Sequence, residues 1–359
     1  MKPQWAFSMK SYVFIFNVER GLSIFIRTPL NQGIIYDFGK SATFSPSTFL
    51  IENIIPHLSK YKNHSVAQTI ISHPHADHIQ DIACLVTPNK GDSPFYATLH
   101  TCPHDKEKSE SINWDRIKNP EGTENLIKIY KEIYQDRNLP LQTIVYDSNC
   151  TIPNIEYGIY YIRPPVIEGI FEDDQKYANG ISLVMFYRHG KHTLLIPGDI
   201  PPEILELILE GKNGLEKRYT IFDKNQMAEH PDWHKETSDQ PTLKSLLATY
   251  GLSVLIAPHH GLESGFSKNL YDALKSGKPG VVAISEKKHL SDNDGKVAQL
   301  YQSKEGAIGQ YVEIEGEREF RYSISTCNGH HILIILQGTG GCPEIYLEKD
   351  PDKLLGQLT

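Results

Sequence analysis

Ser72-His73-Pro74-His75-Ala76-Asp77-His78 is the segment of this 359-residue chain that decides most about its fold. It places three imidazoles and one carboxylate within six positions, directly after an apolar run. Histidines two apart on an extended segment project to the same side, so His73 and His75 can share one metal ion. Asp77 and His78, where we expect a helix to begin, can reach a second ion. The alternative is a solvated histidine-rich turn, which leaves this density of ligands unexplained.

Two later segments supply ligands that the first one lacks. Leu194-Leu195-Ile196-Pro197-Gly198-Asp199 ends a predicted strand in a Gly-Asp pair, which places Asp199 where it can bridge two metals. Pro258-His259-His260-Gly261 does the same with imidazoles after the next strand. Each segment alone is weak evidence for a metal site, since a lone Asp after a strand is more often a helix cap. Together the three segments predict a site for two divalent metal ions, zinc or manganese.

The composition is that of an ordinary globular protein, with 39% hydrophobic and 22% charged residues. The formal charge of −8 argues against a surface that coats nucleic acid, although it allows a local basic groove. The five cysteines are odd in number and lack metal-type spacing, so we expect reduced thiols and a cytoplasmic protein. The longest early apolar run, Tyr12 to Phe16, is too short for a membrane span, and no membrane association is expected.

Strand-type and helix-type patterns alternate along the chain and predict an α/β fold in one domain of residues 1–340, followed by a C-terminal tail of residues 341–359. Polar, patternless stretches predict surface insertions near residues 102–142 and 212–240. A helix is predicted from Ser47 to Lys60, which Pro56 bends or ends. The predicted strands are residues 12–16, 23–27, 33–36, 67–71, 159–162, 181–187, 193–196, 254–257, 281–284, 310–314 and 332–336. Further helices are predicted at residues 124–134, 202–209 and 270–275.

The ligand segments resemble those of the metallo-β-lactamase fold superfamily. Within it, the chain looks most like the ComEC-type branch, the hydrolase domain of bacterial DNA-uptake proteins and its free-standing relatives. The motifs that carry this narrower match are Asn17-Val18-Glu19-Arg20-Gly21, Tyr36-Asp37-Phe38-Gly39, Asn179-Gly180-Ile181-Ser182-Leu183-Val184, His259-His260-Gly261, Ser285 followed by His289, and Thr326 with Gly329 and Ile332. The resemblance spans residues 10 to 337 and implies a four-layer αββα sandwich.

The chain departs from that pattern at three places. Leu22 stands where the family usually has Asp, and Leu290 follows His289 where Pro is expected. The superfamily's extra zinc-ligand histidine has no clear counterpart. His100 and His104 lie in about the right region, and an ordinary loop histidine is the alternative for each.

The resemblance also implies a mechanism. Two metals bridged by Asp199 and a water would supply a hydroxide at neutral pH, which Asp77 could orient. His73 and His75 would hold one ion. The other would be held by Asp77, His78 and one of the two adjacent histidines. We favour His259 as that ligand, by its place before x-Gly, and give His260 a catalytic role as a supporting or substrate contact.

Other residues are candidates for substrate contacts. In the loop of Ser285, Lys287, Lys288 and His289, the histidine could act as general acid and the lysines could pair with phosphates. The alternative for this loop is an ordinary charged turn. Asn179 is a further candidate for binding substrate. Asp37 is expected to orient a ligand histidine, with a plain turn residue as the alternative.

Three functional hypotheses follow. The first is a phosphodiesterase, specifically a nuclease acting on DNA or RNA. The second is a small-substrate hydrolase of the same fold, similar to a phosphocholine esterase or a lactonase, toward which the net charge leans. The third is a degenerate scaffold without activity, against which the complete ligand set weighs.

Overall fold

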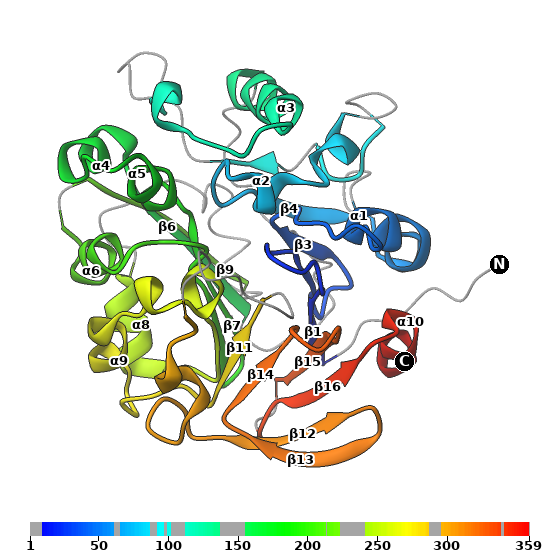
Figure 1. Ribbon diagram of the computed structural model, residues 1–359. Helices are drawn as coiled ribbons and strands as arrows, with labels where there is room; N and C mark the ends of the chain where they lie inside the picture. Colours follow the sequence, from blue (N-terminus) through cyan, green and yellow to red (C-terminus); the bar gives the residue numbers. More distant parts are fainter. Residues whose placement is uncertain are drawn as a thin grey trace.

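The computed structural model describes residues 9–60, 65–86, 92–96, 99–101, 112–136, 155–212, 214–222, 241–286, 296–338 and 341–358. These residues form a mixed α/β fold with two mixed sheets (Figure 1). The α/β class predicted from the sequence is therefore confirmed. Among the described helices, none is long and apolar enough to cross a membrane.

The first sheet has nine described strands in the order β13-β12-β16-β15-β1-β2-β3-β4-β5. Its strands are β1 (Lys10–Ile15), β2 (Ile24–Arg27), β3 (Gly33–Tyr36), β4 (Val66–Ile70), β5 (Leu99–His100), β12 (Gln310–Ile314), β13 (Glu317–Arg321), β15 (His331–Gln337) and β16 (Glu344–Glu348). β1, β2 and β3 form an antiparallel meander. β3 and β4 then pair in parallel, so their carboxyl ends meet at one edge.

The second sheet has seven described strands in the order β14-β11-β10-β8-β7-β6-β9. Its strands are β6 (Ile155–Ile162), β7 (Val184–His189), β8 (His192–Ile196), β9 (Leu215–Phe222), β10 (Val254–Ile256), β11 (Val281–Ile284) and β14 (Ser323–Ser325). β8, β10 and β11 run parallel to one another, which again brings three carboxyl ends to one edge.

The two sheets share a buried apolar core. Val13 and Ile15 of β1 lie in it with Met185 of β7 and Leu194 of β8. Tyr12 and Phe14, on the opposite face of β1, belong to a second cluster that includes helix residues. Because both faces of the strand are covered, its sequence is a continuous apolar run instead of an alternation. Burying each such side chain contributes roughly 1.5–3 kcal/mol.

The helices are short, and several precede or follow the ligand-bearing loops. They are α1 (Pro46–Phe49), α2 (Ala76–Ile79), α3 (Glu124–Asp136), α4 (Pro164–Ile170), α5 (Asp174–Gly180), α6 (Pro202–Glu210), α8 (Leu243–Tyr250), α9 (Lys268–Ala273) and α10 (Pro351–Leu355). Figure 1 shows α4, α5, α6, α8 and α9 grouped beside the second sheet.

The helix predicted from Ser47 to Lys60 is divided. α1 passes into a π-helical turn at Leu50–Ile54 and then a 3-10 turn at Ile55–His57, which contains Pro56. The imino nitrogen of Pro56 has no hydrogen to donate, so a regular α-helix cannot continue through it. The remaining 3-10 turns are Ile82–Leu85, Trp114–Arg116, Pro258–Gly261, Glu263–Gly265, Gln299–Gln302 and Gly356–Leu358.

Three parts of the chain were misjudged from composition. Residues 215–222, placed in a surface insertion, form β9, which pairs with all of β6. Within residues 102–142, the helix predicted at residues 124–134 is confirmed by α3, but it buries Tyr130 and Ile133 in the large apolar cluster, although composition had placed it in a surface insertion. Residues 344–348, placed in a tail, form β16 between β15 and β12. Polar residues at a sheet edge or on one helix face do not mark an insertion, because the opposite face still packs.

Candidate metal centre

The ligand residues of the sequence motifs meet where parallel strands end. Asp37 follows β3, and Ser72 and His73 follow β4. Asp199 follows β8, and His259 follows β10 in the second sheet. The two edges touch, since His78 Nε2 lies 3.3 Å from Asp199 Oδ1. The parallel pairings therefore assemble one site from loops far apart in the sequence.

His78 is fixed by a buried carboxylate. Its Nδ1 lies 2.7 Å from Asp37 Oδ2 and donates to it. The backbone N–H and the hydroxyl of Ser72 also donate to Asp37, at 2.6 and 2.7 Å. Because Nδ1 carries the donated hydrogen, Nε2 is left to face Asp199. Asp37 thus contacts His78 in the way expected of a residue that orients a ligand.

His260 is fixed in a similar way by a carbonyl group. Its Nδ1 donates to the carbonyl oxygen of Ser285 at 3.1 Å. Its Nε2 lies 3.4 Å from Asp77 Oδ2 and 3.5 Å from Asp199 Oδ2. The side chain is 6% exposed. His260 therefore presents one nitrogen between two carboxylates.

This geometry reverses the preference for His259 as the metal ligand. The Nε2 of His259 is 3.9 Å from Asp199 Oδ2, and its Nδ1 lies 3.0 Å from the hydroxyl of Ser264. It is His260, and not His259, whose ligand atom groups with those of Asp77 and His78. The two residues have φ angles of 48° and 55°. Consecutive left-handed residues turn the two side chains in different directions, which spacing alone does not reveal.

Ser285 has a different role from the one predicted. The side chain was expected to contact substrate, but the residue is 2% exposed and its hydroxyl donates to the carbonyl of Gly21 at 2.7 Å. Its own carbonyl accepts from His260. Ser285 therefore supports His260 and links it to the loop before β2.

His73 and His75 form the other part of the centre. His73 Nδ1 lies 3.0 Å from the hydroxyl of Ser72. Since that hydroxyl donates to Asp37, it accepts from His73, which leaves His73 Nε2 as a bare nitrogen. This atom lies 3.0 Å from His75 Nδ1. The two nitrogens are close enough to bind one ion, as the spacing of the motif predicts.

Two glycines allow the surrounding loops to approach Asp77. A Cβ on Gly21, whose φ is +131°, would lie 2.3 Å from the carbonyl oxygen of Asp77. A Cβ on Gly39 would lie 2.8 Å from the same atom. Side chains at either position would push the loops away from the start of α2. The two sequence motifs that end in these glycines therefore serve to close the site.

The residues fit a divalent metal centre. The ligand atoms of His73, His78 and Asp199 lie within 4.8 Å of one another, as do those of Asp77, His78 and His260. The Nε2 atoms of His78 and His260 are buried and have no hydrogen-bond partner in the described part of the chain. Imidazole nitrogens and carboxylate oxygens form the donor set of zinc and manganese sites.

The electrostatics of the cluster favour the metal-binding forms of His73 and Asp199 and the protonated form of His260. Burial, with the nearby imidazoles of His78 and His75, lowers the pKa of His73 well below its usual value. Burial alone would raise the pKa of Asp199, but His260, His78 and His259 hold it well below its usual value. Burial opposes protonation of His260, yet the carboxylates of Asp199 and Asp77 raise its pKa to about 9. A metal ion would take the place of this proton between the carboxylates.

A cavity of about 510 Å³ adjoins the cluster. Asp199 and His259 form part of its wall, beside Asn179 at the end of α5. Asn179 is 4% exposed, and its Oδ1 has no hydrogen-bond partner among the described residues. Arg20 and Lys176 also line the cavity. The structure therefore places Asn179, predicted to contact substrate, beside a cavity at the centre.

Sequence reasoning missed two of these residues. Arg20, whose Nε lies 3.8 Å from Asp77 Oδ2, sits within the motif of residues 17–21 and could have been singled out as its one cation. Lys176 lies in a polar stretch without any distinguishing signal. Lys287, Lys288, His289 and His104 lie outside the described residues, as does the side chain of His100.

No protein-family model matches this chain, and a search of curated proteins also finds no match.

Proposed function

We propose that this chain is a metal-dependent hydrolase that cleaves phosphodiester bonds, built on the four-layer αββα sandwich of the metallo-β-lactamase superfamily in its ComEC-type branch. The observation that carries the proposal is the convergence of Asp77, Asp199 and the unpartnered Nε2 atoms of His78 and His260. The shared core between two sheets, with ligands on the loops at one edge, supports the sandwich.

Two divalent ions, zinc or manganese, would supply Lewis acidity here and lower the pKa of a water molecule. His73 and His75 would hold one ion, and Asp77, His78 and His260 the other. The ligand atom of Asp199 groups with that of His73, and its Oδ2 lies 3.5 Å from His260 Nε2, so we assign it as the carboxylate shared by the two ions.

The cavity beside the centre suits an anionic substrate. Arg20 and Lys176, the latter paired with Glu203 at 3.0 Å, offer cationic donors for phosphate oxygens, and Asn179 offers a buried amide. His259, left without a place in the ligand group, lies 14% exposed on the cavity wall. We assign it to contact the substrate, the role that the sequence gave to its neighbour.

A small phosphodiester is the second candidate substrate. The volume of about 510 Å³ lies in the range of small-molecule sites. Asp173 and Glu203 line the cavity along with the two cations, so its lining is mixed in charge. This favours a compact substrate over a long nucleic-acid strand, whose binding draws on many cations.

The test is hydrolysis by the purified protein loaded with Mn²⁺ or Zn²⁺. The substrates are plasmid, single-stranded oligonucleotide, bis(p-nitrophenyl) phosphate and a lactone, and an Asp77→Ala/His78→Ala protein is the control. Cleavage of either nucleic acid by the parent alone supports the nuclease. Cleavage of the small diester alone supports the second candidate. Turnover of the lactone alone, or of nothing, contradicts the phosphodiesterase.

A further inference from the structure

The histidine loop is attached to the rest of the protein by one side chain from a distant segment. The amide oxygen of Asn119 accepts from the backbone N–H of Ala76 at 2.7 Å. The amide nitrogen of Asn119 donates to the carbonyl of Pro74 at 3.1 Å. These two contacts lie on either side of His75. One planar amide thus holds the backbone of the residue that presents Nδ1 toward His73.

The other end of the same segment is anchored on α5 and the loop before it. Arg116 donates to Asp174 at 3.0 Å and to the carbonyl of Phe171 at 2.8 Å. The backbone N–H of Asn113 donates to the hydroxyl of Tyr177 at 2.8 Å. α5 carries Asn179 and Lys176, which line the cavity at the metal centre. Residues 112–120 therefore connect the wall of that cavity to the histidine loop.

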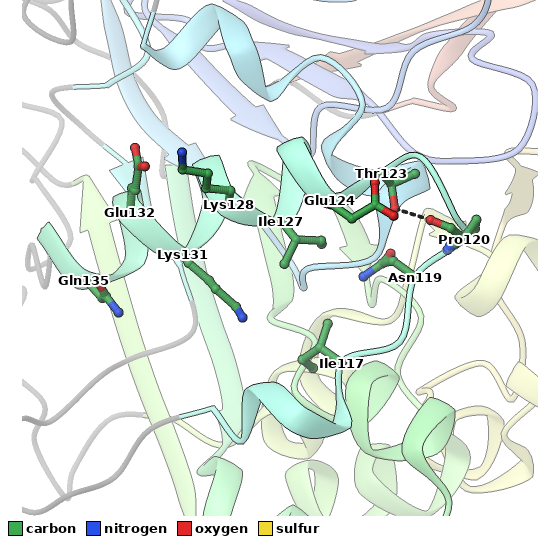
Figure 2. A pocket seen from close by; sticks show the side chains of 10 residues that line it. All are labelled: Ile117, Asn119, Pro120, Thr123, Glu124, Ile127, Lys128, Lys131, Glu132 and Gln135. Atoms are coloured by element: carbon green, nitrogen blue, oxygen red, sulfur yellow. Dashed lines mark hydrogen bonds between the residues drawn. The ribbon is translucent and has the colours of Figure 1, made fainter.

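On one side of Asn119 the attachment borders a cavity. A cavity of about 570 Å³ lies between α3 and residues 117–120, and Asn119 is part of its wall. Figure 2 shows Asn119 at one end of this space, beside Ile117, Ile127 and Pro120. With open space on that side, the position of the loop depends on the two hydrogen bonds of the amide.

We propose that Asn119 is a positioning residue for the metal half-site of His73 and His75. This inference rests on the proposed metal centre and adds to it a residue that touches neither metal nor substrate. Among the described residues, His75 joins no group of three converging ligand atoms. A half-site with so few ligands depends more strongly on how its loop is held, as outer contacts of metal ligands commonly show.

The experiment compares Asn119→Ala with Asn113→Ala in the full chain. The side chain of Asn113 also makes two hydrogen bonds, to Glu168 at 2.6 Å and from the N–H of Asp115 at 3.2 Å. It contacts no residue of the histidine loop in these interactions. Mn²⁺ binding is measured by titration calorimetry, and thermal unfolding without metal checks that both variants fold.

We expect Asn119→Ala to weaken the weaker of two Mn²⁺ binding steps by about tenfold or more, the range seen when such outer contacts are lost. Asn113→Ala should stay within about twofold of the parent. Asn119→Asp keeps the acceptor for Ala76 but turns a carboxylate oxygen toward the carbonyl of Pro74, so it should restore only part of the affinity. In a His75→Ala background, Asn119→Ala should have no further effect, since its target is already gone.

Equal weakening by both alanine variants, or a full effect of Asn119→Ala in the His75→Ala background, would overturn the positioning role. If Asn119→Ala does not fold, Asn119→Asp and its double variant with His75→Ala decide the question. A parent that binds Mn²⁺ but cleaves no substrate refutes the proposed function alone. A parent that binds no Mn²⁺ refutes both.

Discussion

Two clusters of buried histidines lie at opposite ends of β8, and they differ in whether carboxylates lie beside the imidazoles. Beyond its carboxyl end, His78 and His260 lie among Asp37, Asp77 and Asp199. At its amino end, His192 pairs across the β7–β8 hairpin with His189. Both clusters are buried, and both have Nε2 atoms without a partner among the described residues. The neighbours of His189 are instead Ser11, a hydroxyl, and the cation Arg188.

This difference distinguishes the candidate metal site from the buried histidine pair at the amino end of β8. Burial lowers the pKa of His189 to about 4, and it also lowers the pKa of His192. Near the carboxylates the same burial is overcome, and the pKa of His260 is about 9. An imidazole nitrogen without a hydrogen-bond partner therefore does not by itself indicate a metal site. Nearby carboxylates, which would balance the charge of an ion, are the feature that indicates one.

The largest effect on metal content and activity is expected from His78→Ala. His78 belongs to both groups of converging ligand atoms, so His78→Ala should remove the ion that it would hold with Asp77 and His260 and weaken the binding of the other. We expect hydrolysis to fall more than about 1,000-fold, beyond the loss of 10- to 100-fold typical for outer contacts. Metal content by atomic emission and initial rates measure this. His192→Ala, at the other end of β8, should keep its metal, and an equal loss of metal there would contradict the comparison.

The two adjacent histidines beyond β10, His259 and His260, should differ in their effect on metal binding. His260→Ala should weaken metal binding by about 100-fold, because it removes a ligand between two carboxylates. His259→Ala should keep metal affinity within a few-fold and raise KM instead. Calorimetry and steady-state kinetics on the two variants separate these results. The reverse pattern would restore His259 as the ligand.

The smallest expected effect is on the pH dependence of the free energy of unfolding, and it arises from His189, near the amino end of β8. His189 has a pKa of about 4 when folded and about 6.5 when unfolded, so between these values the unfolded state binds more protons. The stabilising contribution is therefore present above pH 6.5 and is lost as the pH falls toward 4. Between pH 7 and pH 5 this amounts to about 2 kcal/mol in the free energy of unfolding.

Urea unfolding of the parent and of His189→Asn at the two pH values measures the difference. Asn does not titrate, so the variant should lose about 2 kcal/mol less than the parent between pH 7 and pH 5. Any stability lost through packing appears at both pH values and cancels. Identical pH dependence in the two proteins would show that His189 does not titrate in this range.

Much of the candidate site could be predicted from the sequence, because its histidines and carboxylates are closely spaced and follow apolar strands. His73, His75, Asp77, His78, Asp199 and the His259–His260 pair do come together. The choice between His259 and His260 depended on two consecutive positive φ angles, which no residue type in the motif signals. Ser285 was misassigned because a motif position does not tell whether the side chain or the carbonyl faces the site.

The strands that sequence reasoning missed share a polar composition. β9, with the sequence Leu-Glu-Lys-Arg-Tyr-Thr-Ile-Phe, is the last strand of the second sheet as far as the chain is described, and charged residues are common in edge strands. Asn119 gave no signal at all. Its role comes from two contacts with the backbone of residues 74 and 76, which are set by tertiary structure and not by any local pattern.

The place of β16 in the first sheet sets the order in which the protein can be completed during translation. β12 and β13 pair with each other, and β12 joins the rest of the sheet through β16 (Figure 1). β16 is synthesised after both. Among the described strands, β12 neighbours only β13 and β16, so the hairpin docks once β16 is in place, and until then the edge of β15 toward it stays open. An incomplete chain therefore presents this edge of β15 to other chains, as unpaired strand edges do.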